Sequence, residues 1–364
     1  MAAPKRIGIL TGGGDCPGLN AVIRAVAKTA MFEYDIEVVG IEDGYRGLIE
    51  GRVRRLESRD VSNILTLGGT ILGSCNRSNP SHFATGKNPD GTPIFEDVTD
   101  RCMATIEKHG IEALVVIGGD GTMAGTRPFI ERGINCIGVP KTIDNDLPGT
   151  EITFGFLTAV QIATDALDRI HTTAASHHRV MIVEVMGRNS GWIALYAGVA
   201  SGADVILIPE RPYDLDAICE FVQHRSSHGK RFSIICISEG ATMAGGSQVV
   251  SRVDPTSPDP IRLGGIGEQL GDDITKRTGQ DTRTTVLGHV QRGGTPIAAD
   301  RLLGTSFGHH AMELLAAGER NRLVVRVGGR FTDIDLATLP EGQRLVGEDN
   351  PLVMAARAVG TCFG

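Results

Sequence analysis

Short apolar runs recur along this 364-residue chain, each followed by glycine and then by a helix-like stretch, and they constrain its fold more than any other feature. Continuous runs of this kind are typical of strands buried on both faces of a parallel sheet. Stretches with helical spacing, such as Ala21–Phe32 and Thr158–His171, lie between them. The alternation predicts an α/β fold with two similar doubly wound domains and mostly parallel sheets. The expected strands are Ile7–Leu10, Val38–Ile41, Ala113–Ile117, Cys136–Val139, Val180–Val183, Val205–Ile208 and Phe232–Ile237.

Length and composition exclude several classes of protein. At about 150 residues per domain, the chain is long enough for two domains. The formal net charge is −7 and aromatic residues are only 4%, so binding of a nucleic-acid backbone or of stacked bases is not expected. Seven cysteines without a CxxC pair favour a reducing cytoplasm over a disulfide framework or a zinc site. No apolar run approaches the ~18 residues that span a bilayer, so we expect no membrane partner.

The loop Thr11–Asn20 follows the first expected strand, at the edge where α/β sheets bind ligands. Its glycines at 12–14 let the backbone approach a ligand, and the helix that follows offers amides to an anion. The loop is neither GxGxxG nor GxxxxGK[ST], so the two best-known nucleotide-binding loops are absent. A tight turn and a phosphate-binding loop both fit these residues.

A second glycine-rich loop, Gly118–Thr122, follows another buried strand and carries Asp120. A carboxylate among glycines, close to an incoming polyphosphate, needs a counter-ion, and magnesium is the usual one. The alternative is that Asp120 only caps the next helix.

The segment Lys141-Thr-Ile-Asp-Asn-Asp146 places two carboxylates two residues apart at a strand end. Such a pair can divide the work: one carboxylate accepts a hydroxyl proton and the other orients metal or substrate. A solvated acidic turn is the alternative interpretation.

Arginines gather in further glycine-flanked segments. Arg179 and Arg188 stand at the two ends of one expected strand, and His289 and Arg292 lie in a loop that follows Arg283. The planar guanidinium matches a phosphate group. One such arginine is usually a surface salt-bridge partner, but several in the loops of an acidic protein favour a phosphate ligand.

Two polar stretches, Asn76–Asp97 and Gly240–Pro260, interrupt the alternation of strands and helices. Proline, serine and aspartate are frequent in both, which predicts surface loops and not domain linkers.

Three motifs together resemble the phosphofructokinase family: Thr142-Ile-Asp-Asn-Asp146, Val185-Met-Gly-Arg188 and Gly288-His-Val-Gln-Arg-Gly-Gly294. The match is in register from the Thr11–Asn20 loop to Asp300 and Arg301. The resemblance implies transfer of a phosphoryl group from ATP, with Mg²⁺, to the 1-hydroxyl of fructose 6-phosphate, a reaction of glycolysis. It also implies a donor-binding domain (1–155 plus about 291–341), a sugar-phosphate domain (156–290 plus about 342–364), and a homotetramer or homodimer with shared active sites.

The same resemblance assigns roles to individual residues. Asp144 matches the proton acceptor, which Asp146 supports, Asp120 matches the magnesium ligand, and Arg77 matches the arginine that steadies the transferred group beside Lys141. Residues expected at the phosphoryl donor are Gly13, Gly14, Arg77, Ser78, Gly119, Asp120, Gly121 and Thr122. Residues expected at the sugar phosphate are Thr142, Ile143, Asp144, Arg179, Met186, Gly187, Arg188, Glu239, Arg283, His289, Val290, Gln291 and Arg292. In the family, the counterparts of Arg179 and Arg283 reach the site of a neighbouring subunit.

The sequence departs from the family pattern at positions that distinguish phosphoryl donors. Gly121 is typical of ATP-using members, whereas Lys141 is typical of pyrophosphate-using members. Where the regulatory nucleotide site has arginines, this chain keeps Arg24 but has Lys28 and His171, which argues against effector control of that kind.

Three functions are alternatives to an ATP-dependent kinase. The most similar one is transfer of a phosphoryl group to the same sugar phosphate from pyrophosphate. A non-catalytic sugar-phosphate-binding regulator would be favoured if Asp120 or Asp144 were replaced, and both are present. An NAD-dependent oxidoreductase lacks the GxGxxG loop with a downstream acid.

Overall fold

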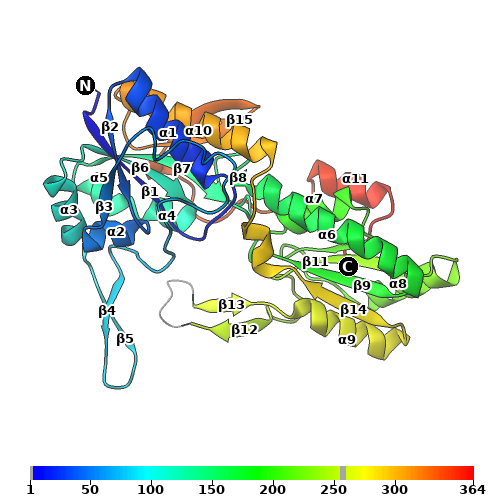
Figure 1. The fold of residues 1–364 in the computed structure, drawn as a ribbon. Coiled ribbons are helices and arrows are strands. Elements are labelled where there is room, and N and C mark those ends of the chain that lie inside the picture. The colour runs from blue at the N-terminus through cyan, green and yellow to red at the C-terminus, as the bar shows by residue number, and fades with distance from the viewer. Residues whose placement is uncertain (1–2, 255–259) are drawn as a thin grey trace.

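The computed structural model describes residues 3–254 and 260–364, and the chain folds around two sheets that lie side by side (Figure 1). Eight strands form the larger sheet: β1 (Arg6–Thr11), β2 (Glu37–Ile41), β3 (Val53–Leu56), β6 (Ala113–Gly118), β7 (Asn135–Thr142), β8 (Phe154–Gly155), β15 (Arg322–Val327) and β16 (Arg330–Asp335). Their order is β16–β15–β7–β6–β1–β2–β3, with β8 paired to β7. The strands run parallel except β3 and β16, which are antiparallel to their neighbours at the two edges.

Four strands form the smaller sheet: β9 (Val180–Val185), β10 (Val205–Leu207), β11 (Ser233–Ser238) and β14 (Thr282–Val286). Their order is β10–β11–β9–β14, and each adjacent pair is parallel. The predicted α/β fold with two mostly parallel sheets is therefore confirmed, although the two sheets differ in size.

Helices cover the sheets on both faces. In the larger sheet, Ile7 and Ile9 of β1 pack into one apolar cluster while Leu10 packs into another on the opposite face. This explains why the strand is apolar at successive positions and not at alternate ones. The described helices are α1 (Leu19–Glu33), α2 (Tyr45–Glu50), α3 (Thr99–Lys108), α4 (Asp120–Ala124), α5 (Arg127–Glu131), α6 (Phe156–His177), α7 (Trp192–Ala200), α8 (Leu215–Ser227), α9 (Ile266–Thr278), α10 (Ala298–Ala316) and α11 (Pro351–Ala358), with short 3-10 turns η1 (Gly288–Arg292) and η2 (Leu336–Thr338). Among the described residues, no helix is long and apolar enough to span a membrane.

Every expected strand overlaps an observed one, and the two expected helical stretches lie within α1 and α6. Strands β3, β8, β14, β15 and β16 were not predicted from the sequence. Strand β14, Thr-Arg-Thr-Thr-Val, lies at the edge of its sheet and is mostly polar, so it lacks the apolar run that marked the central strands.

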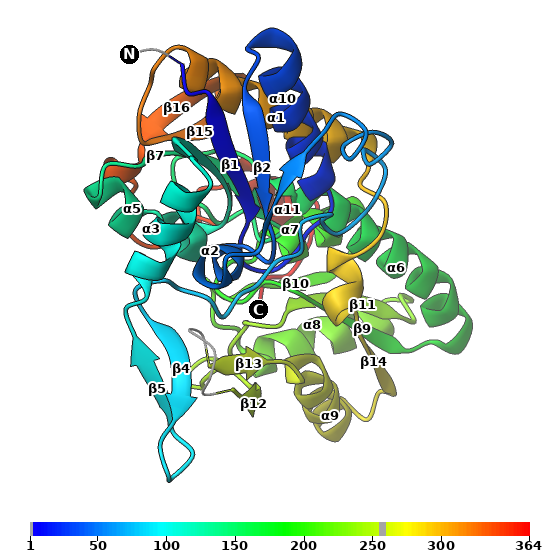
Figure 2. The same ribbon diagram turned by 60° about the vertical axis from the view of Figure 1, so that its left-hand side comes forward.

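The first polar stretch contains an ordered hairpin and the second contains one strand of another, so the prediction that they are loops is wrong in part. The first holds β4 (Phe83–Lys87) paired with β5 (Pro93–Glu96), which projects from the body of the protein in Figure 2. The second leads into β12 (Val250–Val253), which pairs with β13 (Ile261–Leu263); residues 255–259 lie outside the described part. A Pro-Asp-Gly turn joins β4 to β5, and such a turn is itself a hairpin signal.

Candidate active site

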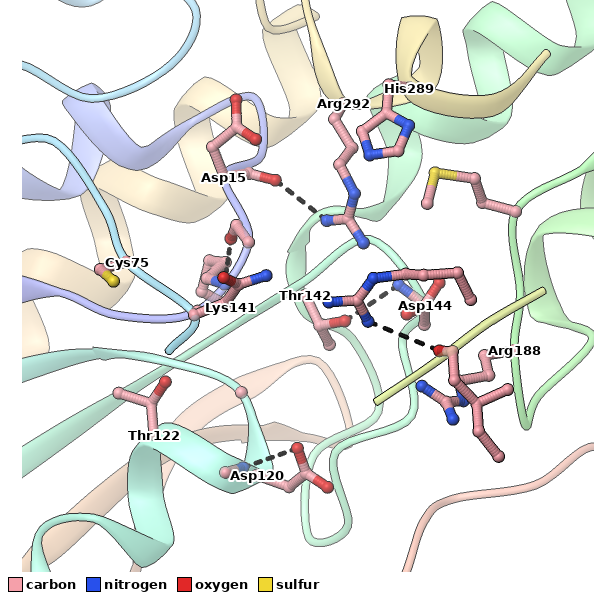
Figure 3. Close-up of a pocket in the computed structure, with 18 of the residues that line it drawn as sticks. Asp15, Cys75, Asp120, Thr122, Lys141, Thr142, Asp144, Arg188, His289 and Arg292 are labelled. Atoms are coloured by element: carbon pink, nitrogen blue, oxygen red, sulfur yellow. Dashed lines mark hydrogen bonds between the residues drawn. The ribbon is translucent and has the colours of Figure 1, made fainter. Parts of the chain in front are cut away.

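A cavity of about 950 Å³ lies where loops of the two sheets meet (Figure 3). The loops that follow β1, β6 and β7 line one side, and those that follow β9 and β11 line the other. These are the carboxyl ends of parallel strands, where ligands bind in α/β proteins. The expected site residues that line it are Gly13, Gly14, Ser78, Gly119, Asp120, Gly121, Thr122, Lys141, Thr142, Asp144, Met186, Arg188, Glu239, His289 and Arg292.

Lys141, near the carboxyl end of β7, contacts the loop that follows β1. Its side chain is only 4% exposed, and Nζ donates a hydrogen bond to the carbonyl oxygen of Gly14, 2.5 Å away. Gly13 has a φ of +77°, and a Cβ there would stand 3.3 Å from the same Nζ, so glycine permits the approach. Burial lowers the pKa of Lys141, since the ammonium loses its hydration.

Asp144 points its carboxylate into the cavity (Figure 3). Its Oδ1 is buried and has no hydrogen-bond partner within the described residues. Burial raises the pKa of Asp144, while the positive charges of Arg292 and Lys141 act in the opposite direction. A buried carboxylate oxygen that is not bonded to protein, beside two cations, is suited to accept a proton from a ligand.

Asp146 lies behind Asp144 and does not line the cavity. Burial, followed by the negative charges of Asp144 and Asp120, raises the pKa of Asp146 to about 7. Between the two carboxylates, Asn145 has a φ of +53°, and its Oδ1 accepts a hydrogen bond from the amide of Thr153 at 2.9 Å. That bond holds the turn in a conformation that few residues other than glycine and asparagine adopt readily.

Arg344, which the sequence analysis did not identify, also holds this turn. Its amide donates to the carbonyl of Asp146 and its Nη2 to the carbonyl of Asn145, each at 2.7 Å. The guanidinium lies 4.1 Å from the ring centroid of Trp192, whose Nε1 donates to the Arg344 carbonyl at 2.7 Å. Because Trp192 begins α7, Arg344 connects the Asp144–Asp146 turn to the smaller sheet's side of the cavity.

Asp120 is the first residue of α4, and its Oδ1 accepts a hydrogen bond from the amide of Gly121 at 2.6 Å. The N-cap residue of α4 is Gly119, so Asp120 contacts the first turn from within the helix and does not cap it, and it also lines the cavity. A Cβ at Gly121 would find no atom within 4 Å, so the space beside this residue is open. The hydroxyl of Tyr45 donates to the carbonyl of Thr122 at 2.7 Å and fixes the next residue of the loop.

The opposite side of the cavity carries Met186, Arg188, Glu239, His289 and Arg292. Burial, together with the negative charges of Asp144 and Glu184, raises the pKa of Glu239 to about 7. Gln291 does not line the cavity; its Oε1 accepts from the amide of Met186 at 3.0 Å and so ties the two loops together.

Several expected site residues lie outside the cavity lining. The side chain of Arg77 forms an ion pair with Asp254 at 2.7 Å. Arg179 and Arg283 both pair with Asp281 near the amino ends of β9 and β14, at the opposite end of the smaller sheet from the cavity. Ile143, Asp146, Gly187, Val290 and Gln291 complete this group.

The cavity also has lining residues that were not among the expected site residues, and four of them, Asn76, Asn79, Ser251 and Arg252, come from the two polar stretches. These additional lining residues are Asp15, Tyr45, Cys75, Asn76, Asn79, Gly125, Ser251, Arg252, Ile261, Arg262 and Leu263.

The acidic residues fit a magnesium ion that is bound together with a polyphosphate. The described residues hold no group of three or more His, Cys, Asp or Glu side chains that would bind a metal by themselves. Magnesium is usually held by one or two carboxylates plus substrate phosphates and water. Asp120, whose carboxylate lines the cavity, meets that requirement.

Comparison with known proteins agrees with this geometry. The family model described as Phosphofructokinase matches residues 6–315, which include the whole cavity lining. The chain belongs to the phosphofructokinase family. The resemblance stated from the motifs is thereby confirmed.

Relatives of the chain carry names for both phosphoryl donors. A protein of Clostridium perfringens named ATP-dependent 6-phosphofructokinase 2 is 49% identical over 364 residues, 100% of this chain and 99% of its own length. A protein of Amycolatopsis methanolica named pyrophosphate–fructose 6-phosphate 1-phosphotransferase is 46% identical over 333 residues, 91% of this chain and 93% of its own length. Among solved structures, phosphofructokinase of Pichia pastoris in the T-state aligns with a TM-score of 0.78 at 31% identity, over 93% of this chain and 38% of that one.

Proposed function

We propose that the chain transfers the terminal phosphoryl group of ATP to the 1-hydroxyl of fructose 6-phosphate, giving fructose 1,6-bisphosphate. The observation that carries the proposal is the buried, unsatisfied Oδ1 of Asp144, between the glycine-rich loops of one sheet and the arginine-bearing loops of the other. Membership of the family and the names of the ATP-dependent relatives, which are 45–49% identical, support the same activity, whereas the relative of Amycolatopsis methanolica, at 46% identity, is named for pyrophosphate.

Asp144 is the general base of this reaction. The 1-oxygen of the sugar attacks the terminal phosphorus, the bond from that phosphorus to the bridging oxygen breaks, and ADP leaves. Asp144 accepts the hydroxyl proton, and Asp146 supports it from behind. Burial makes Asp144 a stronger base than an exposed aspartate, while Lys141 and Arg292 keep the ionised form accessible.

The remaining groups neutralise charge, which is what phosphoryl transfer mainly requires. Lys141 faces the donor loop, and Gly13, Gly14, Ser78 and Gly119–Thr122 present backbone and hydroxyl groups to the donor phosphates. Asp120 would hold a magnesium ion, which when bound supplies positive charge against those phosphates. Arg77 has to exchange its ion pair with Asp254 for the transferred group.

The sugar phosphate lies against Thr142, Met186, Arg188, Glu239, His289 and Arg292. Ile143, Gly187 and Gln291 shape the same loops from behind, whereas Val290 is exposed. Arg179 and Arg283, which lie away from the cavity of their own chain, act on the site of a neighbouring subunit in a homodimer or homotetramer.

The two sheets divide the work. Residues 1–155 with about 291–341 form the donor-binding domain, and 156–290 with about 342–364 form the sugar-phosphate domain. Both substrates are small, cytoplasmic molecules, and the site requires neither nucleic acid nor membrane.

Gly121 favours ATP over pyrophosphate. The open space beside it leaves room for the part of ATP beyond its two terminal phosphates, which an aspartate would fill and repel. The positive charge of Lys141 can assist either donor, so this residue discriminates between ATP and pyrophosphate less strongly than Gly121 does.

A coupled assay with saturating magnesium and either ATP or pyrophosphate tests this proposal. We expect faster turnover with ATP, and the Gly121→Asp variant should lose most ATP-dependent kcat/KM. Faster turnover of the wild type with pyrophosphate would assign the chain to the pyrophosphate-dependent alternative. If the protein bound fructose 6-phosphate but turned over neither donor, the non-catalytic sugar-phosphate-binding regulator would be the remaining interpretation.

A further inference from the structure

The β12–β13 hairpin supplies a side of the cavity that no family motif covers. It contributes Ser251, Arg252, Ile261, Arg262 and Leu263 to the lining. The carboxylates of the lining, Asp15, Asp120, Asp144 and Glu239, all come from other loops, so the charged side chains that the described part of the hairpin adds to the lining are the two arginines.

Arg252 and Arg262 are directly opposite each other in the antiparallel pairing of the hairpin. Residues opposite each other project from the same face of the ribbon, and like charges in that position destabilise it. An irregularity between Val250 and Arg252 shifts the register, and such bulges re-aim side chains near functional sites. A two-stranded ribbon is also only marginally stable alone, so a ligand that bridges the two arginines would stabilise it.

A third arginine faces the same region. Arg188, from the loop after β9, lines the same cavity as Arg252 and Arg262. Burial lowers the pKa of Arg188 and the positive charge of Arg262 lowers it further, while the negative charge of Glu239 acts in the opposite direction. The lining of the cavity therefore brings Arg188, Arg252 and Arg262 together around space that a ligand can enter.

The hairpin also reaches the other side of the cavity. Asp254, next to the end of β12, pairs with Arg77 of the loop between β3 and β4 at 2.7 Å. Neighbours of Arg77 in that loop, Asn76, Ser78 and Asn79, line the cavity. The ion pair thus joins the hairpin to a loop that lines another part of the same cavity.

We propose that the β12–β13 hairpin is an additional phosphate-binding site, in which Arg252 and Arg262 bind a phosphate group of the ligand in the cavity. Two planar guanidinium groups on one face match the oxygens of a phosphate. The assignment of that phosphate to the nucleotide or to the sugar rests on the proposed function. The binding of a phosphate group by the hairpin does not depend on it.

Inorganic pyrophosphate is the first probe, titrated calorimetrically into the full chain. We expect Arg252→Gln and Arg262→Gln each to weaken its binding by about tenfold, and the double variant by more, as for loss of a charge-assisted hydrogen bond. Arg252→Lys and Arg262→Lys should restore part of the affinity. Arg59→Gln is the matched control, because Arg59 is 81% exposed and does not line the cavity.

Separate titrations with ATP and with fructose 6-phosphate identify the source of the phosphate, since the ligand whose affinity falls is the one the hairpin binds. Wild-type affinity of the double variant for pyrophosphate, ATP and fructose 6-phosphate would overturn the proposal, even if the enzyme turns over as proposed. Weakened pyrophosphate binding in a protein that phosphorylates no sugar would support the hairpin site while the proposed function fails.

Discussion

The Asp144–Asp146 turn and the Arg179–Arg283 pair are both expected to act in the same reaction, but they differ in burial and in their position relative to the cavity. The turn is buried and held by Thr153 and Arg344. The two arginines are partly exposed and share a single carboxylate, Asp281, at the far end of the smaller sheet. A proton acceptor needs a fixed position and a shifted pKa, both of which burial within one chain supplies. Arginine stays charged whether exposed or buried, so it can serve at a surface between subunits.

We expect the largest loss of activity from a substitution in the buried Asp144–Asp146 turn. Asp144→Asn keeps the shape of the side chain but cannot accept the proton, so kcat should fall by about 10²–10⁴ with a smaller change in KM. Asp100→Asn, at a residue whose side chain is 93% exposed, is the control. If the Asp144 variant kept more than about half of the wild-type kcat, another group would have to be the base.

The exposed arginines should show a smaller effect of a different kind. Arg179→Ala and Arg283→Ala should each raise KM for fructose 6-phosphate by about 10- to 100-fold, because each removes a charged contact with phosphate. Steady-state kinetics with sugar phosphate as the varied substrate measures this. Arg211→Ala, which removes an exposed arginine paired with Glu348, should leave KM unchanged.

Mixed oligomers separate an action within the chain from one across subunits. Subunit exchange between Asp144→Asn and Arg179→Ala proteins should restore part of the activity, because some sites then combine an intact Asp144 with a neighbour's intact Arg179. Hybrids shown to have exchanged but without activity would remove the shared site from the proposal.

The sequence predicted the parts of the molecule whose signals are local. Apolar runs gave the central strands, and each glycine-rich loop directly follows its strand. What it missed depends on contacts between distant residues: Arg344 is 199 positions from Asn145, whose carbonyl it binds. The stretch Gly240–Pro260, which contains β12, was predicted to be a surface loop because serine, proline and aspartate are frequent in it, and only the fold brings Arg252 and Arg262 to the cavity.

Arg344 allows a test of how rigidly the buried turn must be held. Arg344→Met removes the hydrogen bond to the Asn145 carbonyl but preserves much of the volume, so kcat should fall by about tenfold while KM changes little. The fluorescence of Trp192, the single tryptophan, should change as well because the guanidinium stacked on its ring is lost. Arg357→Met is the matched control, since Arg357 lies over the ring of Phe363 away from the cavity. An unchanged kcat together with altered fluorescence would make Arg344 structural only.

The smallest expected effect is on stability, and it follows from Asp146. Its pKa rises from an ordinary value of 3.8 to about 7 on folding, first because the carboxyl is buried and then because Asp144 and Asp120 are negatively charged. A carboxyl whose pKa is higher in the folded state stabilises the fold when protonated, so its contribution is complete below about pH 4 and is lost as the pH rises through about 7. Asp146→Asn cannot ionise, and its free energy of unfolding, relative to that of the wild type, should therefore improve between pH 5 and pH 7.5. Urea unfolding of both proteins at the two pH values measures this difference, with Asp100→Asn as the exposed control. A constant difference across the two pH values would mean that Asp146 is already ionised at pH 5 in the folded protein, and burial of the turn would then not be what sets its protonation.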